Sequence, residues 1–223
     1  MWTLCLVVAA GAAPVHGERL SFVAEWMGIT AGTAVAETRS RGDSWVFEVR
    51  SKSAGWRAGL YPVDDRLSST WSAATGSSRY ETVFREGRFQ QDQVMLFDGE
   101  SVFVSRRQLF DEGWRSWDDR YVSAGALEDP VSALWRLREE GEGTYQVFSG
   151  KKALPVVVVG AGAEEVGGVR AHRLDVRTVH DGDLKDRMSV WISADGDALP
   201  LRAVVATRAG PVTVRLTGRE VLP

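Results

Sequence analysis

The closing stretch of the chain, residues 188–217, constrains the fold most. Residues 212–217 alternate strictly between apolar and polar types, and a period of two is typical of a β-strand with one buried face. Two further strand-like runs, 188–193 and 199–208, precede it, and Asp195-Gly196-Asp197 supplies turn chemistry between them. A three-stranded meander is marginally stable alone, so this one is expected to belong to a larger sheet.

The same alternation recurs through most of the chain. It marks strand-like runs at residues 20–26, 33–38, 45–53, 66–72, 80–85, 90–97, 102–109, 145–148, 154–159 and 169–178. Turns such as Glu86-Gly87 and Asp98-Gly99 are typical of hairpins. We predict a mainly β fold, a strongly curved antiparallel sheet or barrel of roughly ten to twelve strands in meander order, because large open sheets curl or split.

One segment, residues 129–140, has the pattern of a helix. Asp129 is a good N-cap, Pro130 suits the first helical position, and Gly141 suits the end. One face of this helix would carry Val131, Leu134, Trp135 and Arg138. A lone helix in a β protein has to bury that face, so we expect it to cover or plug the sheet.

The first residues are typical of a secretory signal peptide. An apolar run at 4–13 is followed by Val15-His16-Gly17, with small or permitted residues before a cleavage point. At about 15 residues the apolar stretch is shorter than the roughly 20 that a membrane-spanning helix needs. We expect residues 1–17 to be removed and residues 18–223 to form a single β-rich exported domain.

Composition narrows the function classes. The chain has 223 residues and a net charge of −3, with acidic and basic residues mixed and no Lys/Arg cluster, so a nucleic-acid partner is not expected. The single cysteine, Cys5, lies in the predicted signal. The mature domain is therefore expected to have neither a disulfide nor thiol chemistry.

Residues 156–168 begin like a dinucleotide-binding fingerprint, with an apolar strand leading into Gly160 and Gly162. The third glycine of that fingerprint would be at position 165, where Glu165 would repel a pyrophosphate. Residues 169–176 then alternate like a strand. We predict a β-hairpin that turns at Gly167-Gly168.

No catalytic or metal-ligating set emerges. The paired carboxylates are Asp64 with Asp65, Asp118 with Asp119, and Asp195 with Asp197. Adjacent residues on a strand point to opposite faces, and the third pair lies in a turn, so none is expected to act jointly. The sequence lacks grouped Cys and His for zinc, a Gly-x-Ser-x-Gly elbow, and the spacing of a calcium loop. We expect a protein that is not an enzyme and that binds no cofactor or metal.

Residues 55–65 are predicted to form an ordered loop or a helical turn, and residues 111–128 an irregular segment. Both are rich in aromatic and charged residues. Their aromatic residues would fill the core or cap a barrel mouth, or they would line a cavity for an apolar or amphipathic ligand. With the helix, they give the candidate ligand-binding set: Trp56, Arg57, Tyr61, Asp64, Asp65, Arg66, Trp114, Trp117, Tyr121, Leu134 and Trp135.

Several pieces of the chain resemble a known family. They are residues 18–22, 26–33, 60–66, 84–88, 129–134, 190–193 and 199–202. In this order they resemble the bacterial exported family catalogued as domain of unknown function 3108. The resemblance implies a mostly β protein of the Gram-negative envelope and carries no established reaction. More distantly, the closing meander is similar to the periplasmic lipoprotein carriers, which fold as a curved antiparallel sheet with helices over an apolar cavity.

Three functions stay open at this point. The first is a periplasmic, non-enzymatic binding or carrier module for a lipid or other apolar ligand. The alternative is an envelope structural or assembly factor that binds a protein partner through the segments 55–65 and 114–121. The third is an enzyme acting on envelope glycans through Asp64 or Asp65.

Overall fold

The computed structural model describes residues 17–55, 59, 61–123, 125, 127–180, 183–207 and 210–223. Apart from Gly17, the predicted signal peptide at residues 1–17 lies outside these residues, and it stays a prediction. Within the described residues one sheet of fourteen strands runs in the order β8-β7-β6-β5-β4-β3-β2-β1-β14-β13-β12-β11-β10-β9. All of its strand pairs are antiparallel.

The strands are β1 (Glu18–Trp26), β2 (Ile29–Arg41), β3 (Ser44–Ser53), β4 (Asp64–Ser72), β5 (Gly76–Glu86), β6 (Phe89–Phe97), β7 (Ser101–Phe110), β8 (Gly113–Val122), β9 (Gly143–Phe148), β10 (Ala153–Val166), β11 (Val169–His180), β12 (Asp183–Ser193), β13 (Pro200–Val205) and β14 (Val212–Val221). The predicted antiparallel meander is confirmed. The strand that the sequence reading missed is β8, which was assigned to an irregular segment.

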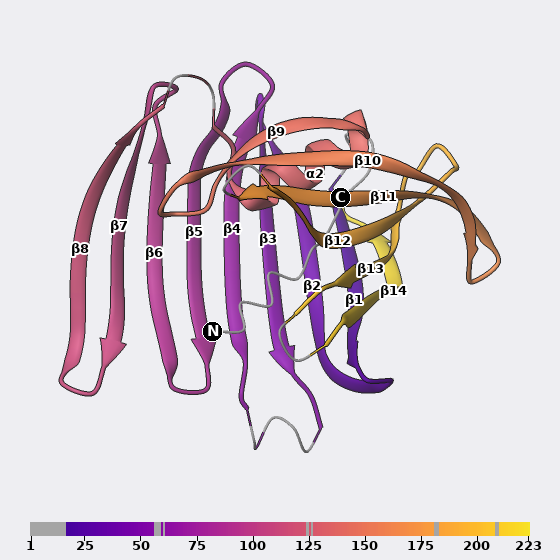
Figure 1. Cartoon of the computed structure of the whole chain (residues 1–223), viewed down its shortest axis with the longest axis horizontal. Coiled ribbons are helices and arrows are strands. Elements are labelled where there is room, and N and C mark those ends of the chain that lie inside the picture. Colours follow the sequence, from indigo (N-terminus) through magenta and orange to yellow (C-terminus); the bar gives the residue numbers. More distant parts are fainter. Residues whose placement is uncertain are drawn as a thin grey trace.

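The sheet curls without closing. Strand β1 pairs with both β2 and β14, whereas β8 and β9 are the two edges. Strands β1–β8 stand side by side, and β9–β13 cross in front of them (Figure 1). The face between these two halves holds the core, to which both contribute: in β1, for example, Leu20, Phe22 and Ala24 are buried and alternate with half-buried residues.

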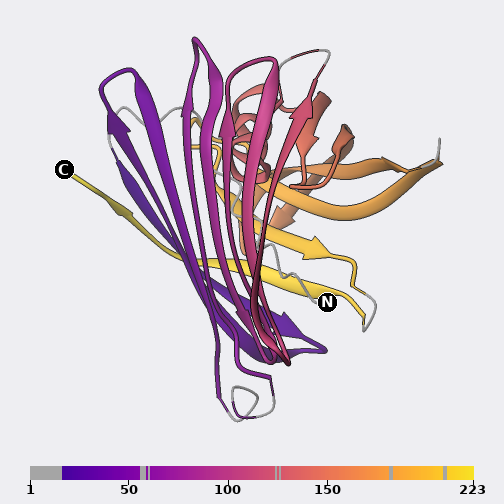
Figure 2. The ribbon, with the colours of Figure 1, turned by 90° about the vertical axis from the view of Figure 1, so that its left-hand side faces the viewer.

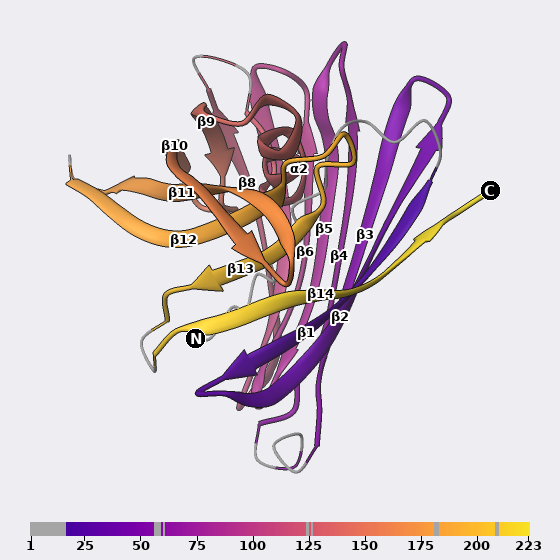
Figure 3. The ribbon, with the colours of Figure 1, turned by 90° about the vertical axis from the view of Figure 1, so that its right-hand side faces the viewer.

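Helix α2 (Pro130–Glu140) lies between the two halves and contacts β4 and β9 (Figure 3). The predicted helix and its plugging position are therefore confirmed. The described residues contain no helix that is both long and apolar enough to cross a membrane.

The N-cap of α2 also attaches the helix to the sheet. One oxygen of the Asp129 carboxylate accepts the backbone N–H groups of Val131 at 2.8 Å and Ser132 at 3.0 Å. The other accepts the hydroxyls of Ser69 on β4 at 2.7 Å and Ser77 on β5 at 2.8 Å. Burial raises the pKa of Asp129 above its usual value, and the hydrogen bonds from Ser69, Ser77 and Ser132 offset part of that rise. The cap residue thus fixes both where the helix begins and where it sits on the sheet.

The apolar face of α2 is held by an aromatic cluster. The Trp135 ring lies 5.1 Å from the rings of Phe47 and Trp71 and 5.9 Å from that of Trp45, measured between centroids. Trp135 is 1% exposed, so the indole fills the space between the helix and strands β3 and β4.

The hairpin between β10 and β11 turns at Gly167 and Gly168, whose φ angles are 59° and 82°. The prediction of a strand, turn and strand at this position is confirmed. A dinucleotide fingerprint needs a helix after the glycines, so residues 156–168 do not have its structural context.

Candidate functional site

The open seam of the sheet, between the edge strands β8 and β9, forms a pocket. The two edges approach each other where the Tyr121 and Phe148 rings lie 5.0 Å apart. Residues 127–129, which lead into α2, run along β9: the Glu128 N–H donates to the Gln146 carbonyl at 2.9 Å, and the Phe148 N–H donates to the Glu128 carbonyl at 2.8 Å. The seam is thus bridged by side chains and a short connecting segment instead of a continuous ladder.

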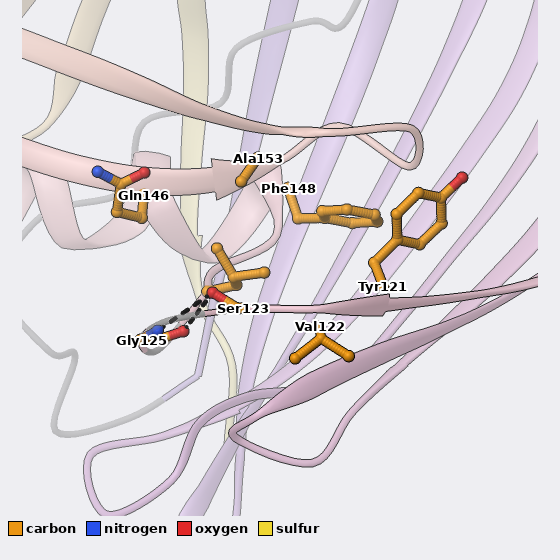
Figure 4. A pocket seen from close by; sticks show the side chains of 8 residues that line it. Tyr121, Val122, Ser123, Gly125, Gln146, Phe148 and Ala153 are labelled. Carbon is orange, nitrogen blue, oxygen red and sulfur yellow. Dashed lines mark hydrogen bonds between the residues drawn. The ribbon is translucent and has the colours of Figure 1, made fainter.

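The pocket at this seam has a volume of about 490 Å³. Its described lining is Tyr121, Val122, Ser123, Gly125, Leu127, Gln146, Phe148 and Ala153. Figure 4 shows the two rings side by side, with Val122 on one side and Gln146 and Ala153 on the other. A volume in this range is typical of sites for small molecules.

The chemistry of this lining is mainly apolar with a few polar groups. The rings of Tyr121 and Phe148 and the side chains of Val122 and Leu127 offer apolar surface. The Ser123 hydroxyl is engaged with Gly125, donating to its carbonyl at 2.7 Å and accepting its N–H at 3.2 Å. An amide at Gln146 could orient a ligand's polar end. Such a lining suits a ligand with a long apolar part.

A second group of side chains lies at the far end of β4 and β5. Asp65 is fully buried, and its carboxylate accepts the Arg85 N–H at 2.8 Å. The Tyr61 hydroxyl donates to the buried Glu86 carboxylate at 3.5 Å. Burial raises the pKa of Asp65, and Glu86 is a hydrogen-bonding neighbour that lowers it. The pKa of Tyr61 is raised by burial and by the charge of Glu86.

The raised pKa of Asp65 gives a prediction. Because the pKa of Asp65 is higher in the folded protein than in the unfolded chain, proton binding favours the folded state. This contribution to stability is fully present below the unfolded pKa, and it is lost as the pH rises through the folded pKa. We expect Asp65→Asn to become more stable than the wild type as the pH rises above about 4, the pKa of an aspartate in the unfolded chain. Urea unfolding at a series of pH values measures this.

The matched control is Asp64→Asn, because Asp64 is the half-buried neighbour on the other face of β4, 3.5 Å from Lys52. Because this variant retains Asp65, it should keep the loss of stability with rising pH that Asp65 causes in the wild type. A stability curve for Asp65→Asn that runs parallel to that of the wild type would contradict the prediction.

Comparison with known proteins identifies the chain. A family model described as "Protein of unknown function (DUF3108)" matches residues 21–217. The chain belongs to this family. No curated protein matches it.

The DUF3108 fold is shared with a solved structure, a beta-barrel-like protein of domain of unknown function DUF1849 from Brucella abortus. The two chains are 9% identical, and the alignment covers 94% of this chain and 99% of the other with a TM-score of 0.62. At that identity the likeness shows the barrel-like fold alone.

The DUF3108 structure separates the residues that the sequence grouped into one site. Trp56 and Arg57 lie outside the described residues. Tyr61 and Asp65 come together at the start of β4, and Tyr121 lines the seam pocket. The remaining candidates are dispersed. Asp64, half-buried, and Arg66, exposed, lie on the outer face of β4. Leu134 is half-buried against the core, and Trp135 is enclosed in its aromatic cluster.

The prediction that residues 111–128 are irregular throughout is wrong, and this changes the roles of two aromatic residues. Residues 113–122 form β8, so Trp114 and Trp117 point to opposite faces of the sheet. The Arg107 guanidinium carbon lies 4.9 Å from the centroid of the Trp114 ring, whereas that of Arg106 lies 5.6 Å from the centroid of the Trp117 ring. The two indoles therefore do not line one cavity.

Sequence reasoning missed most of the seam lining. Phe148, Leu127 and Gln146 belong to the pocket because β8 and β9 happen to be the two edges of the sheet. The only local signal was the strand-like run at 145–148. Within the described residues no group of three or more His, Cys, Asp or Glu could hold a metal ion.

Proposed function

We propose that this DUF3108 protein is a non-enzymatic binding or carrier module of the bacterial envelope, and that it takes the apolar part of a lipid-like ligand into the seam pocket. The observation that carries the proposal is the pocket of about 490 Å³ between edge strands β8 and β9. The secretory pattern at residues 1–17 supports a location in the periplasm.

The position of the pocket favours a binding role. A barrel that fails to close leaves its two edges free to separate or approach without breaking a ladder of hydrogen bonds. Here the edges meet through the Tyr121–Phe148 ring contact. An acyl chain entering between them would replace one apolar contact by others, which costs little polar desolvation.

The test is binding of a fluorescent fatty acid, 11-(dansylamino)undecanoic acid, to the purified protein and to Val122→Asp. Val122 lines the pocket and is 81% exposed, so a carboxylate there can be tolerated by the fold. It would face the apolar ligand and is expected to weaken the affinity about tenfold or more. Organic extraction of protein purified from its native envelope, followed by mass spectrometry, should release a lipid.

The matched control is Val221→Asp, at the end of β14, where Val221 is 61% exposed and outside the described pocket lining. It should bind the probe like the wild type. A wild-type protein that binds no probe and carries no lipid would refute the proposal. Equal affinities for the two variants would place any binding outside the seam.

A further inference from the structure

The outer edge of β8 is unpaired within the part of the chain that the structure describes. Gly113–Val122 pairs with β7 in continuous register, without a bulge, and has no described strand on its other side. In Figure 2 this edge faces the viewer and no other strand covers it. Along an antiparallel edge strand, alternate residues direct their N–H and C=O groups outwards, where another strand can bind.

Several devices that protect sheet edges are missing from β8. Its ten residues include neither proline nor lysine, and Trp114 and Trp117 are exposed at 43% and 38%. What remains is a set of four charges, on Arg115, Asp118, Asp119 and Arg120. Such charges oppose pairing with most strands, but favour a strand that places opposite charges against them.

We propose that the partner is a second copy of this chain, bound β8 to β8 in antiparallel fashion about a two-fold axis at Trp117. The resulting interface is isologous, so each contact away from the axis occurs twice. It continues the sheet of one copy into the sheet of the other.

Symmetry restricts the possible registers. Two identical edge strands pair about an axis perpendicular to the sheet, and residues opposite each other must share a face. The axis therefore passes midway between one residue and the same residue of the second copy. Each residue before that position then pairs with the residue of the second copy that is equally far after it. With Trp117 on the axis, Arg115 faces Asp119, Ser116 faces Asp118 and Trp114 faces Arg120.

Two of these pairs and the contact on the axis are favourable. Arg115 with Asp119 brings opposite charges together, and Trp114 with Arg120 places a guanidinium beside an indole. Trp117 meets its own copy as an aromatic pair. The contacts that these groups make within the chain are on its surface. The Asp119 carboxylate is 45% exposed and lies 3.9 Å from Arg106, and Arg115 pairs with the exposed Glu112 at 3.1 Å. Arg120 donates to Ser101 at 3.3 Å, a contact that it would share with the partner's Trp114.

The neighbouring register is unfavourable. With Asp118 on the axis, two Asp118 carboxylates lie side by side, which is destabilising. That register also places Arg115 against Tyr121 and Arg120 against Ser116, so it leaves the charges without opposite partners. The charge order of β8 therefore favours the register centred on Trp117 over the one centred on Asp118.

The first test is an exchange of charges, read by sedimentation velocity over a range of protein concentrations. The wild type is expected to show a dimer. Arg115→Asp and Asp119→Arg should each be monomeric at concentrations where the wild type is dimeric, because each places like charges opposite each other twice. The double variant Arg115→Asp/Asp119→Arg should recover the dimer.

The control for these variants is Arg50→Asp, since Arg50 is 64% exposed on β3, away from the edge. It should dimerise like the wild type. A wild type that stays monomeric at every concentration overturns the proposal, whether or not β8 binds a different protein.

The second test fixes the register by disulfide formation in a Cys5→Ser background. Residues directly opposite each other on antiparallel strands have Cβ atoms about 4.5–5.5 Å apart, close to what a disulfide requires. Trp117→Cys should form an intermolecular disulfide, while Trp114→Cys, which faces Arg120, should not. Preferential crosslinking of Asp118→Cys would overturn the register centred on Trp117, and crosslinking at none of these positions would overturn the interface.

Discussion

Replacing Arg138 with leucine is expected to lower the free energy of unfolding by about 3–5 kcal/mol. The Arg138 guanidinium donates to the Glu18 carboxylate at 2.7 Å, and the two side chains are 1% and 2% exposed. It also donates to the backbone carbonyls of Ala198 at 2.6 Å and Asp197 at 2.9 Å. One side chain of α2 thus holds β1 and the turn before β13.

The size of this effect comes from the partners that are left behind. Burial lowers the pKa of Arg138 to about 10, so the group is charged at neutral pH and balances Glu18. Without it, the Glu18 carboxylate keeps Arg219 at 3.4 Å but loses its buried partner, and two carbonyls lose their donor. A buried charge or polar group without a partner is costly.

Urea unfolding at pH 7 measures the loss. Arg50→Leu is the matched control, because its guanidinium is 64% exposed and 3.9 Å from Glu48, and a change within about 1 kcal/mol is expected there. The double variant Glu18→Leu/Arg138→Leu should recover part of the loss, since it removes both charges together. A cost for Arg138→Leu no larger than that of Arg50→Leu would contradict this account.

The elements that the sequence predicted well are those with local signals. The helix was predictable because Asp129, Pro130 and Gly141 mark its two ends, and the structure places the cap and both ends as expected. Hairpins with Gly-containing turns, such as that at Gly167-Gly168, were predictable for the same reason. These signals involve residues that are neighbours in sequence.

Strand β8 was not predictable by alternation because it has no single buried face. All but two of its residues, Gly113 and Tyr121, are exposed, so apolar and polar types need not alternate. The pattern of period two reports burial on one side, and an edge strand at an open seam lacks that burial. The same exposure hid the opposite orientations of Trp114 and Trp117.

The candidate site depended on information that no local pattern carries. The seam pocket exists because the first half of the sheet ends at β8 and the second half ends at β9. Which strands become edges is decided by long-range pairing, above all the pairing of β1 with β14. Tyr121 was selected for its aromatic character, and its partner Phe148 could be found only in the folded chain.

Helix α2 links this seam to the core. The segment that precedes it, residues 127–129, pairs with β9 and lines the pocket at Leu127. The helix itself is fixed by Asp129, Trp135 and Arg138. A substitution that weakens the attachment of α2 should therefore lower the free energy of unfolding and also alter the seam pocket.

Trp135→Ala tests that link and is expected to lower the free energy of unfolding by about 3–5 kcal/mol. The indole packs against Phe47 and Trp71 at 5.1 Å, and its loss would leave a cavity between α2 and strands β3 and β4. Where the variant is still folded, it should also bind 11-(dansylamino)undecanoic acid more weakly than the wild type. The reason is that a less firmly held helix no longer fixes residues 127–129 against β9.

Trp114→Ala is the matched control at concentrations where the protein is monomeric, since it removes the same side chain from an exposed position beside Arg107 and Arg85. Its expected cost is about 1–2 kcal/mol, because two exposed cation–π contacts of about 0.5–1 kcal/mol each are lost. The affinity for the probe should not change. Equal costs for the two tryptophan variants would show that the aromatic cluster does not hold the helix. A large loss of stability in Trp135→Ala with an unchanged probe affinity would separate the helix from the seam, and the pocket would then depend on β8 and β9 alone.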